Sequence, residues 1–268
     1  MKQQKSRVVT LSTDFGDKMG YVAQMKGVML SINPQLQIVD IDHHLPPHDI
    51  AAASLVLEQC HSYFPTGTIH VAVIDPGVGT RRRAISLQTE TAFFVGPDNG
   101  LFGFLEKDHK VRSARRLTNE RYFLDKQSRT FHGRDIFAPV AAYISLGYPC
   151  DEFGPLLDHV LTLAADRVKR IDGEIHGEVV AIDDFGNLIT SIPQEDLDGY
   201  MFENSEREVF AYLGGQLIPI HNTFGNVPEG EILAYIGSGD RLEVAVNRGS
   251  AEKLLKASTG QQVKLITI

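Results

Sequence analysis

Several features are scarce in this chain of 268 residues, and each scarcity excludes a class of protein. Tryptophan is absent, and the two cysteines, Cys60 and Cys150, are too few for a disulfide framework and lack metal-site spacing. No apolar run approaches the roughly 18 residues of a membrane span. The N-terminal segment MKQQKSR leads into a strand pattern without an apolar signal region. We therefore expect no membrane association and a reducing, cytoplasmic location.

Positive charge is also in short supply. Lysine and arginine total 26 against 34 aspartates and glutamates, which gives a net charge of -8. Binding to a phosphate backbone requires a basic face, so nucleic acid is not an expected partner. The hydrophobic content of 43% and charged content of 22% are those of an ordinary globular protein. This length favours one large and one small domain.

The first part of the chain alternates strand and helix patterns. Strands are predicted at 7–12, 36–41 and 68–74, with helices at 21–32 and 49–60 between them. This β-α-β-α-β order predicts a largely parallel sheet with helices on its faces. The rest of this α/β domain, residues 1–165, contains further predicted elements: short strands near 84–87, 92–95 and 111–117, and helical patterns through 104 and at 136–146.

The pattern changes after residue 165. Residues 166–173 are charged and lack periodicity, which predicts a linker. Beyond them, short β-like runs are separated by Gly, Asn, Asp and Pro, and this spacing predicts a small β-barrel domain over 174–268. Only 251–256 has a helical pattern there.

Two predicted strands end at an acidic residue. Asp75 follows the strand at 68–74, and a Pro-Gly-Val-Gly turn then leads to Arg82. Asp14 follows the first strand. Ligands of such folds bind outside the carboxyl ends of the strands, where a carboxylate can accept hydrogen bonds from ribose hydroxyls. An ion pair between Asp75 and Arg82 that only closes the loop is an equally weighted interpretation.

Three other segments allow more than one interpretation. The run Asp40-Ile41-Asp42-His43-His44 contains metal-ligand residue types, but a hydrogen-bonded turn is favoured over a metal site. His132 precedes a helical pattern, where a cap or core hydrogen bond competes with a catalytic role. In the second domain, Phe185 and Phe224 lie in polar loops and either sandwich a purine or fill the core.

The motifs as a set resemble one known family. They are STDFG at 12–16, VAQMKG at 22–27, IDPGVGT at 74–80, GPDNGL at 96–101, TFHGRDIFAP at 130–139 and DDFGNLIT at 183–190. Together they are similar to the S-adenosyl-L-methionine hydroxide adenosyltransferases, which are relatives of the fluorinase and chlorinase enzymes. The resemblance implies an α/β N-terminal domain, a C-terminal β-barrel and a homotrimer whose active sites lie between chains.

The resemblance also implies roles for individual residues. Asp75, Arg82 and His132 match the family's hydrolytic triad, and Asp14 matches its ribose-binding acid. The remaining matches fall in the second domain: Asn187 for adenine, Phe185 and Phe224 for the aromatic walls, and Asp183 and Ser238 for the methionine end. Met19 and Gly239 depart from the pattern, because related enzymes have an acid and an arginine there. Arg241 or Arg248 is a candidate to replace that arginine.

The implied activity is hydrolysis of S-adenosyl-L-methionine to adenosine and L-methionine, by attack of an activated water at C5′. The sulfonium leaves as a neutral thioether, so we expect neither a metal nor a cofactor. Two alternatives stay open at this point. A chlorinase-like halogenase is disfavoured because the carboxylate of Asp75 repels a halide. A non-catalytic adenosine- or S-adenosylmethionine-binding protein is compatible with the departures at Met19 and Gly239.

Overall fold

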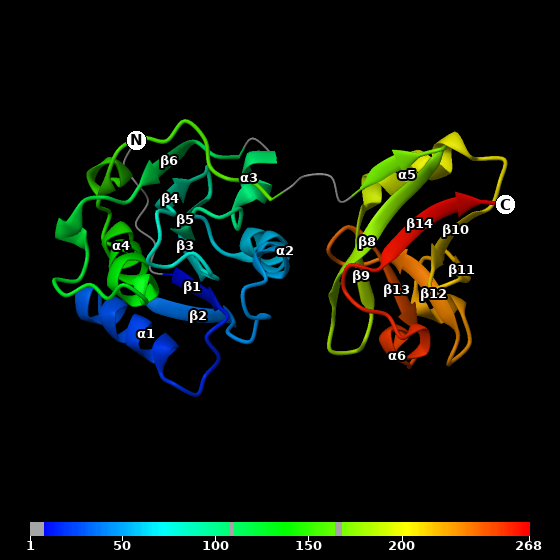
Figure 1. Cartoon of the computed structure of the whole chain (residues 1–268), viewed down its shortest axis with the longest axis horizontal. Helices are drawn as coiled ribbons and strands as arrows, with labels where there is room; N and C mark the ends of the chain where they lie inside the picture. Colours follow the sequence, from blue (N-terminus) through cyan, green and yellow to red (C-terminus); the bar gives the residue numbers. More distant parts are fainter. Residues whose placement is uncertain (1–7, 108–109, 164–167) are drawn as a thin grey trace. The chain divides into compact units, whose positions relative to one another are not determined.

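A computed structural model describes residues 8–107, 110–163 and 168–268, and Figure 1 shows the chain. The chain divides into two compact units, residues 1–163 and 164–268. The predicted domain end at residue 165 and the first linker residues, 166 and 167, lie outside the described residues. Within the described ranges, no helix is both long and apolar enough to cross a membrane.

The first unit is built on a six-stranded sheet in the order β2-β1-β3-β5-β4-β6. Neighbours from β2 through β5 pair in parallel, and β4 pairs antiparallel with both β5 and β6. The predicted largely parallel sheet is therefore confirmed, with an antiparallel edge. Its strands are β1 (Val8–Thr13), β2 (Gln37–Asp42), β3 (Thr68–Val73), β4 (Ala84–Gln88), β5 (Ala92–Pro97) and β6 (Ser113–Arg116).

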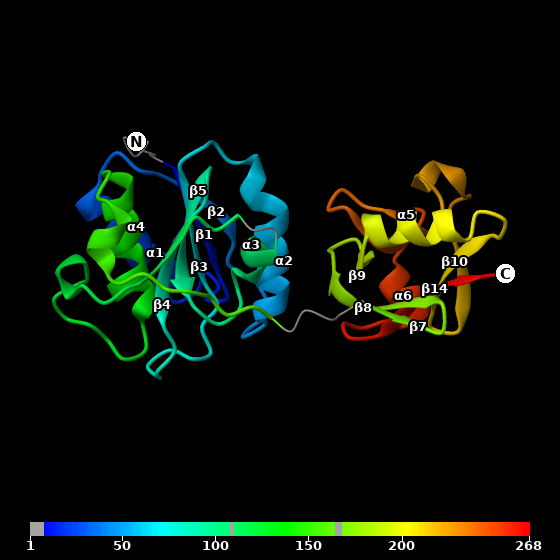
Figure 2. The same ribbon diagram turned by 90° about the horizontal axis from the view of Figure 1, so that it is seen from above.

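Helices cover both faces of this sheet, as Figure 2 shows. On one face lie α1 (Tyr21–Ile32) and α4 (Ala138–Ser145), and on the other α2 (Ile50–Cys60) and α3 (Gly103–Lys107). Each strand contributes side chains to the hydrophobic cores on both faces of the sheet, because successive side chains of a strand point to opposite faces. The predicted helices at 21–32 and 49–60 are confirmed, and Asp49 caps α2 by accepting from two backbone N–H groups.

The second unit contains an antiparallel sheet that nearly closes into a barrel. The strand order is β11-β10-β14-β8-β9-β13-β12, with β7 paired to β8. An isolated bridge between Ile220 and Ala234 connects the two ends of this order. The predicted barrel is therefore confirmed. Its strands are β7 (Lys169–Ile171), β8 (Glu174–Ile182), β9 (Leu188–Pro193), β10 (Val209–Leu213), β11 (Gln216–Pro219), β12 (Ile232–Ile236), β13 (Arg241–Val246) and β14 (Gln262–Thr267).

One prediction for the second unit is wrong. Besides α6 (Ala251–Leu255), the described residues contain α5 (Gln194–Glu203), which the sequence pattern did not predict. Only Leu197 and Tyr200 of α5 are buried, so its apolar stripe is too narrow to produce a helical period. The strand β7, which lies within the predicted linker, was also not predicted. Its three residues are exposed and have no apolar pattern, and they form a strand only by pairing with β8.

Candidate active site

Asp75 and Arg82 form a largely buried, two-point ion pair. Asp75 follows β3, and Arg82 Nε donates to its Oδ1 at 2.8 Å while Nη2 donates to Oδ2. The two side chains are only 5% and 10% exposed, so solvent screens this pair weakly. Arg82 also lies over the ring of Phe137, 5.3 Å from its centre. The ion pair that the loop spacing suggested is therefore present.

Glycine is required where this loop meets a second segment. Gly79 has a φ of +76°, and a Cβ there would lie 2.5 Å from the carbonyl oxygen of Arg129. Only a residue without a side chain allows such an approach in this conformation. The loop that carries Asp75 and Arg82 is thereby packed against the segment that leads to His132.

His132 lies directly against Arg82. Nη2 of Arg82 is 2.9 Å from Nδ1 of His132. Burial lowers the pKa of His132 below its ordinary value of 6.5, and the charge of Arg82 lowers it further, while Asp75 and Asp135 oppose both effects. The imidazole is therefore neutral at neutral pH. The structure thus brings Asp75, Arg82 and His132 together, although 50 residues separate Arg82 from His132.

A π-helical turn, Gly133–Phe137, follows His132 and continues into α4, so helical structure begins before the predicted residue 136. Such turns often occur at functional sites. Asp135 within it is fully buried and accepts hydrogen bonds from Ser128 N at 2.6 Å and Arg134 Nε at 2.6 Å. Asp135 therefore anchors both ends of the segment that carries His132. The sequence interpretation missed this residue; a lone acid directly before an apolar helical pattern was the available signal.

Asp14 lies at the same edge of the sheet as Asp75. Thr13 pairs with Val73 across the parallel strands β1 and β3, so both acids lie just beyond paired strand ends. The side chain of Asp14 is 9% exposed, and its Oδ2 accepts from the backbone N–H of His48 at 2.9 Å. The strand pairing of Thr13 and the hydrogen bond from His48 together hold Asp14 at the carboxyl end of the sheet.

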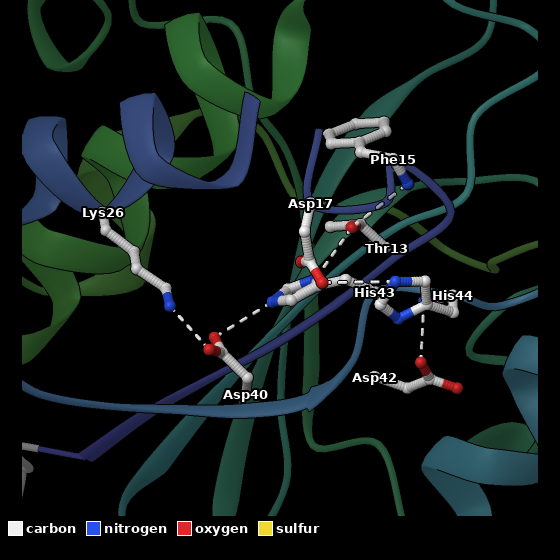
Figure 3. A network of polar contacts seen from close by, with 8 residues as sticks. All are labelled: Thr13, Phe15, Asp17, Lys26, Asp40, Asp42, His43 and His44. Carbon is white, nitrogen blue, oxygen red and sulfur yellow. Dashed lines mark hydrogen bonds and ion pairs between the residues drawn. The ribbon is translucent and has the colours of Figure 1, made fainter. Parts of the chain in front are cut away.

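The acidic and histidine-rich run 40–44, at the carboxyl end of β2, forms hydrogen bonds with its own backbone and with neighbouring side chains (Figure 3). His44 N donates to Asp42 Oδ1 at 2.7 Å, which confirms the predicted hydrogen-bonded turn. His43 lies between Thr13 and Asp40. Among the residues that the structure describes, no three His, Cys, Asp or Glu side chains are grouped so as to hold a metal ion.

In the second unit, Asp183 organises the turn between β8 and β9. Its Oδ1 accepts from the backbone N–H groups of Phe185 at 3.0 Å and Asn187 at 2.8 Å, and its Oδ2 accepts from Asn187 Nδ2 at 2.8 Å. Asn187 is buried, whereas Phe185 is 78% exposed at the tip of the turn. The turn therefore holds the asparagine amide and presents the aromatic ring to solvent.

The two loop aromatics differ in their surroundings. The ring of Phe224 is half-buried and lies 4.9 Å from that of Tyr235, so Phe224 covers a small apolar cluster with Leu233 and Ala245. Phe185 does not fill the core. The interpretation that both rings fill the core is therefore wrong for Phe185. The exposed Ser238 lies between β12 and β13.

Glu243 is a buried acid that the sequence interpretation missed. It accepts a hydrogen bond from Tyr235 Oη at 2.5 Å, and a Cβ at Gly237 would collide with its carboxylate. Burial raises the pKa of Glu243; the hydrogen bond from Tyr235 opposes this shift, and the nearby charge of Asp183 adds to it. No sequence motif marks Glu243, because its burial follows from strand pairing.

Both candidate replacements for the arginine that Gly239 lacks have other partners. Arg241 Nη1 donates to the carbonyl of Ser191 at 3.1 Å. Arg248 forms an exposed ion pair with Glu229. Met19, the other departure, is 69% exposed.

Comparison with known proteins places this geometry in context. The family model "SAM hydroxide adenosyltransferase N-terminal domain" matches residues 9–154, and the corresponding C-terminal domain matches residues 177–264. The chain is 39% identical to an (R)-S-adenosyl-L-methionine hydrolase of Thermus thermophilus, over 97% of this chain and all of that one. A fluorinase of Actinoplanes is 27% identical over 90% of this chain and 91% of its own. A crystal structure of an uncharacterized conserved protein from Thermotoga maritima superposes with a TM-score of 0.87 at 35% identity, covering 96% of this chain and 99% of that one.

Proposed function

The chain belongs to the SAM hydroxide adenosyltransferase family, and we infer that it hydrolyses S-adenosyl-L-methionine to adenosine and L-methionine. The relative from Thermus thermophilus, named an (R)-S-adenosyl-L-methionine hydrolase, supports this activity. The observation that carries the proposal is the contact of Arg82 with both Asp75 and His132. This group lies at the sheet edge that Asp14 shares.

The reaction makes modest demands on the protein. The sulfonium is its own leaving group, because cleavage of the C5′–S bond returns the electron pair to sulfur and releases neutral methionine thioether. The protein must hold a water in line with that bond and accept its proton. Positioning of this kind supplies about 7–11 kcal/mol in well-oriented model reactions. We therefore propose that the chemical step uses neither a metal nor a cofactor.

The hydrogen bonds suggest how the proton moves. Arginine has no acceptor, so Arg82 donates to Nδ1 of neutral His132, whose own proton is then on Nε2. His132 would therefore hold the water by donating from Nε2, and would not act as its base. Each carboxylate oxygen of Asp75 keeps a second lone pair after accepting from Arg82. We propose that Asp75 accepts the proton as the water oxygen bonds to C5′.

The other residues are proposed to hold the substrate. Asp14 would accept hydrogen bonds from the ribose hydroxyls. In the second unit, Asn187, Phe185 and Phe224 would contact adenine, while Asp183 and Ser238 would lie at the methionine end. The homotrimer with active sites between chains and the cytoplasmic location belong to the same proposal. Light scattering of the purified protein tests the trimer.

The name of the Thermus relative suggests a finer choice of substrate, since it specifies the (R) form. We propose that this chain also prefers the (R) epimer. The test is incubation of purified protein with each sulfonium epimer, followed by chromatographic separation of the products. We expect adenosine and methionine in equal amounts, formed faster from the (R) epimer. Equal rates would contradict the preference alone, whereas no adenosine from either epimer would contradict the hydrolase.

The same assay addresses both alternatives. In molar chloride, a chlorinase-like enzyme would form 5′-chloroadenosine, whereas the carboxylate of Asp75 would repel a halide. A binding protein would retain adenosine or substrate without turnover. We expect adenosine to remain the nucleoside product at every chloride concentration.

A further inference from the structure

A chain of polar contacts runs from the exposed Asp40 inward to Thr13, the residue before Asp14 (Figure 3). Lys26 Nζ lies 2.6 Å from Asp40 Oδ2, and Asp40 Oδ1 lies 3.0 Å from His43 Nε2. His43 Nδ1 lies 2.9 Å from Thr13 Oγ1. These contacts join α1, β2 and the end of β1, which are separate in the sequence.

The chemistry of the partners fixes which group donates and which accepts in each of these contacts. Asp40 Oδ2 accepts from Lys26, and Asp40 Oδ1 lies 3.0 Å from Nε2 of His43. Two bare acceptors repel each other at this distance, so the proton of a neutral His43 is on Nε2. Nδ1 of a neutral His43 then accepts from the hydroxyl of Thr13, and the Thr13 oxygen accepts from Phe15 N at 3.4 Å. Burial of Asp40 raises its pKa, but the hydrogen bonds from Lys26 and His43 outweigh burial and leave the pKa of Asp40 below 3.8. An ionised Asp40 thus lies between Lys26 and His43.

This arrangement looks like an acid–histidine–hydroxyl relay, but its hydroxyl cannot reach a substrate. Thr13 is 0% exposed, and His43 is 6% exposed. A nucleophile must contact the atom that it attacks. The chain therefore acts on its neighbours in the protein. Its inner end holds the two residues that flank Asp14, namely Thr13 and Phe15.

The segment after β2 also holds the Asp14 loop through its backbone. Gly16 N donates to the carbonyl of His43 at 2.8 Å, and His48 N donates to Asp14 Oδ2 at 2.9 Å. His44 Nε2 lies 3.2 Å from Asp17 Oδ2, in a more exposed pair. The loop is thus attached before, at and after Asp14.

We propose that His43, oriented by Asp40 and hydrogen-bonded to Thr13, is a positioning residue for Asp14, and that this chain sets the selectivity for nucleosides that have ribose hydroxyls. The proposal rests on the proposed function of Asp14 as the ribose-binding acid. It assigns a role to the histidine-rich run, whose residue types otherwise suggested a metal site. A displaced Asp14 would lose its hydrogen bonds to the hydroxyls, while contacts to the base would remain.

The chain supplies a matched control. Thr10 lies on the same strand, is also 0% exposed, and its hydroxyl lies 2.8 Å from Nδ1 of a buried histidine, His70. Thr13→Val and Thr10→Val therefore remove the same atom from the same kind of hydrogen bond. Thr10 is remote from the carboxyl end of β1. Removal of its hydroxyl therefore tests the effect on stability without changing the Asp14 loop. Thr13→Ser restores the hydroxyl and serves as the rescue.

The experiment measures binding of adenosine and 2′,3′-dideoxyadenosine to the full-length protein by calorimetry. Wild type should prefer adenosine by roughly tenfold or more, because hydrogen bonds to a charged group are strong. We expect Thr13→Val to reduce this preference to about threefold or less, while Thr10→Val and Thr13→Ser keep it. If Thr13→Val does not fold, His43→Phe breaks the same chain at a neighbouring buried position.

The outcomes separate the proposal from its premise. Asp14→Ala should abolish the preference. A Thr13→Val protein that keeps the wild-type preference, while Asp14→Ala loses it, would overturn the positioning role and leave Asp14 as the ribose ligand. Equal loss in Thr10→Val would also overturn it, because the effect would then follow from stability. An Asp14→Ala protein with an unchanged preference would contradict both statements.

Discussion

The guanidinium of Arg82 donates from Nη2 to Nδ1 of His132 across 2.9 Å. Because a guanidinium cannot accept, this contact requires a neutral imidazole with its proton on Nε2. Protonation of His132 would place two donors face to face and two positive charges side by side. Arg82 therefore couples the carboxylate of Asp75 to the protonation state of a histidine.

This coupling predicts a pH dependence. Burial and Arg82 lower the pKa of His132, so the neutral form persists below the ordinary value of 6.5. Activity should be constant near neutral pH and fall as the pH drops through the lowered pKa, with the inflection below 6.5. The profile of kcat/KM against pH measures this. In Arg82→Gln the charge is removed, and the His132 ring signal in NMR should titrate closer to 6.5; an unchanged titration would contradict the coupling.

Substitution of the proposed base should separate catalysis from binding. In Asp75→Asn we expect turnover to fall by about 10²–10⁴ while the substrate Kd changes only a few-fold. Asp98→Asn is a matched control, because Asp98 is also a buried acid beyond a strand end and is paired with Arg83. It should keep most of the turnover. Wild-type turnover in Asp75→Asn would rule out its role as proton acceptor.

Gly79, where the loop of Asp75 and Arg82 packs against the segment that leads to His132, should be sensitive to one added methyl group. Gly79→Ala combines a left-handed φ with a Cβ 2.5 Å from the Arg129 carbonyl, and should cost at least about 2 kcal/mol of stability together with activity. Gly27→Ala, at an exposed position of α1 with no atom within 4 Å of the added Cβ, should instead stabilise by about 0.5–1 kcal/mol. Urea unfolding and the adenosine assay measure both variants. Equal changes in unfolding free energy for Gly79→Ala and Gly27→Ala would contradict the close packing at Gly79.

His70 should make the first unit sensitive to acid. Burial, and secondarily the charge of His61, lower the pKa of His70 from 6.5 to about 3. Between pH 6.5 and about 3, His70 binds a proton in the unfolded chain but not in the folded chain. The free energy of unfolding is therefore unaffected by His70 above pH 6.5 and decreases as the pH falls toward 3. By about pH 4.5 the loss should reach about 2–3 kcal/mol.

The variant His70→Phe removes this titration and keeps a ring stacked on Phe94, which lies 4.9 Å from His70. The difference in unfolding free energy between neutral and acidic pH should shrink by the same amount in the variant. An equal acid loss in both proteins would show that other groups dominate.

Local pattern in the sequence determined the architecture. Runs such as Thr68 to Ile74 are apolar and bounded by turn residues, and their alternation with helical spacing is sufficient to predict a parallel sheet. The same runs predicted that Asp14 and Asp75 follow strands, because an acid that ends an apolar run is a local feature. The pairing of Asp75 with Arg82 was also within reach, since only seven residues separate them.

Only the tertiary structure decided what these residues contact across long separations. The helix α5 depends on packing against the barrel, and Glu243 is buried by strand pairing, so neither leaves a periodic signal. The proton position on His132 follows from a contact between residues 50 apart, and the proposed role of His43 rests on its contacts with Thr13 of β1 and Asp40 of β2. Periodicity records which face of an element is buried, whereas hydrogen-bond direction depends on which partner the fold places opposite each side chain.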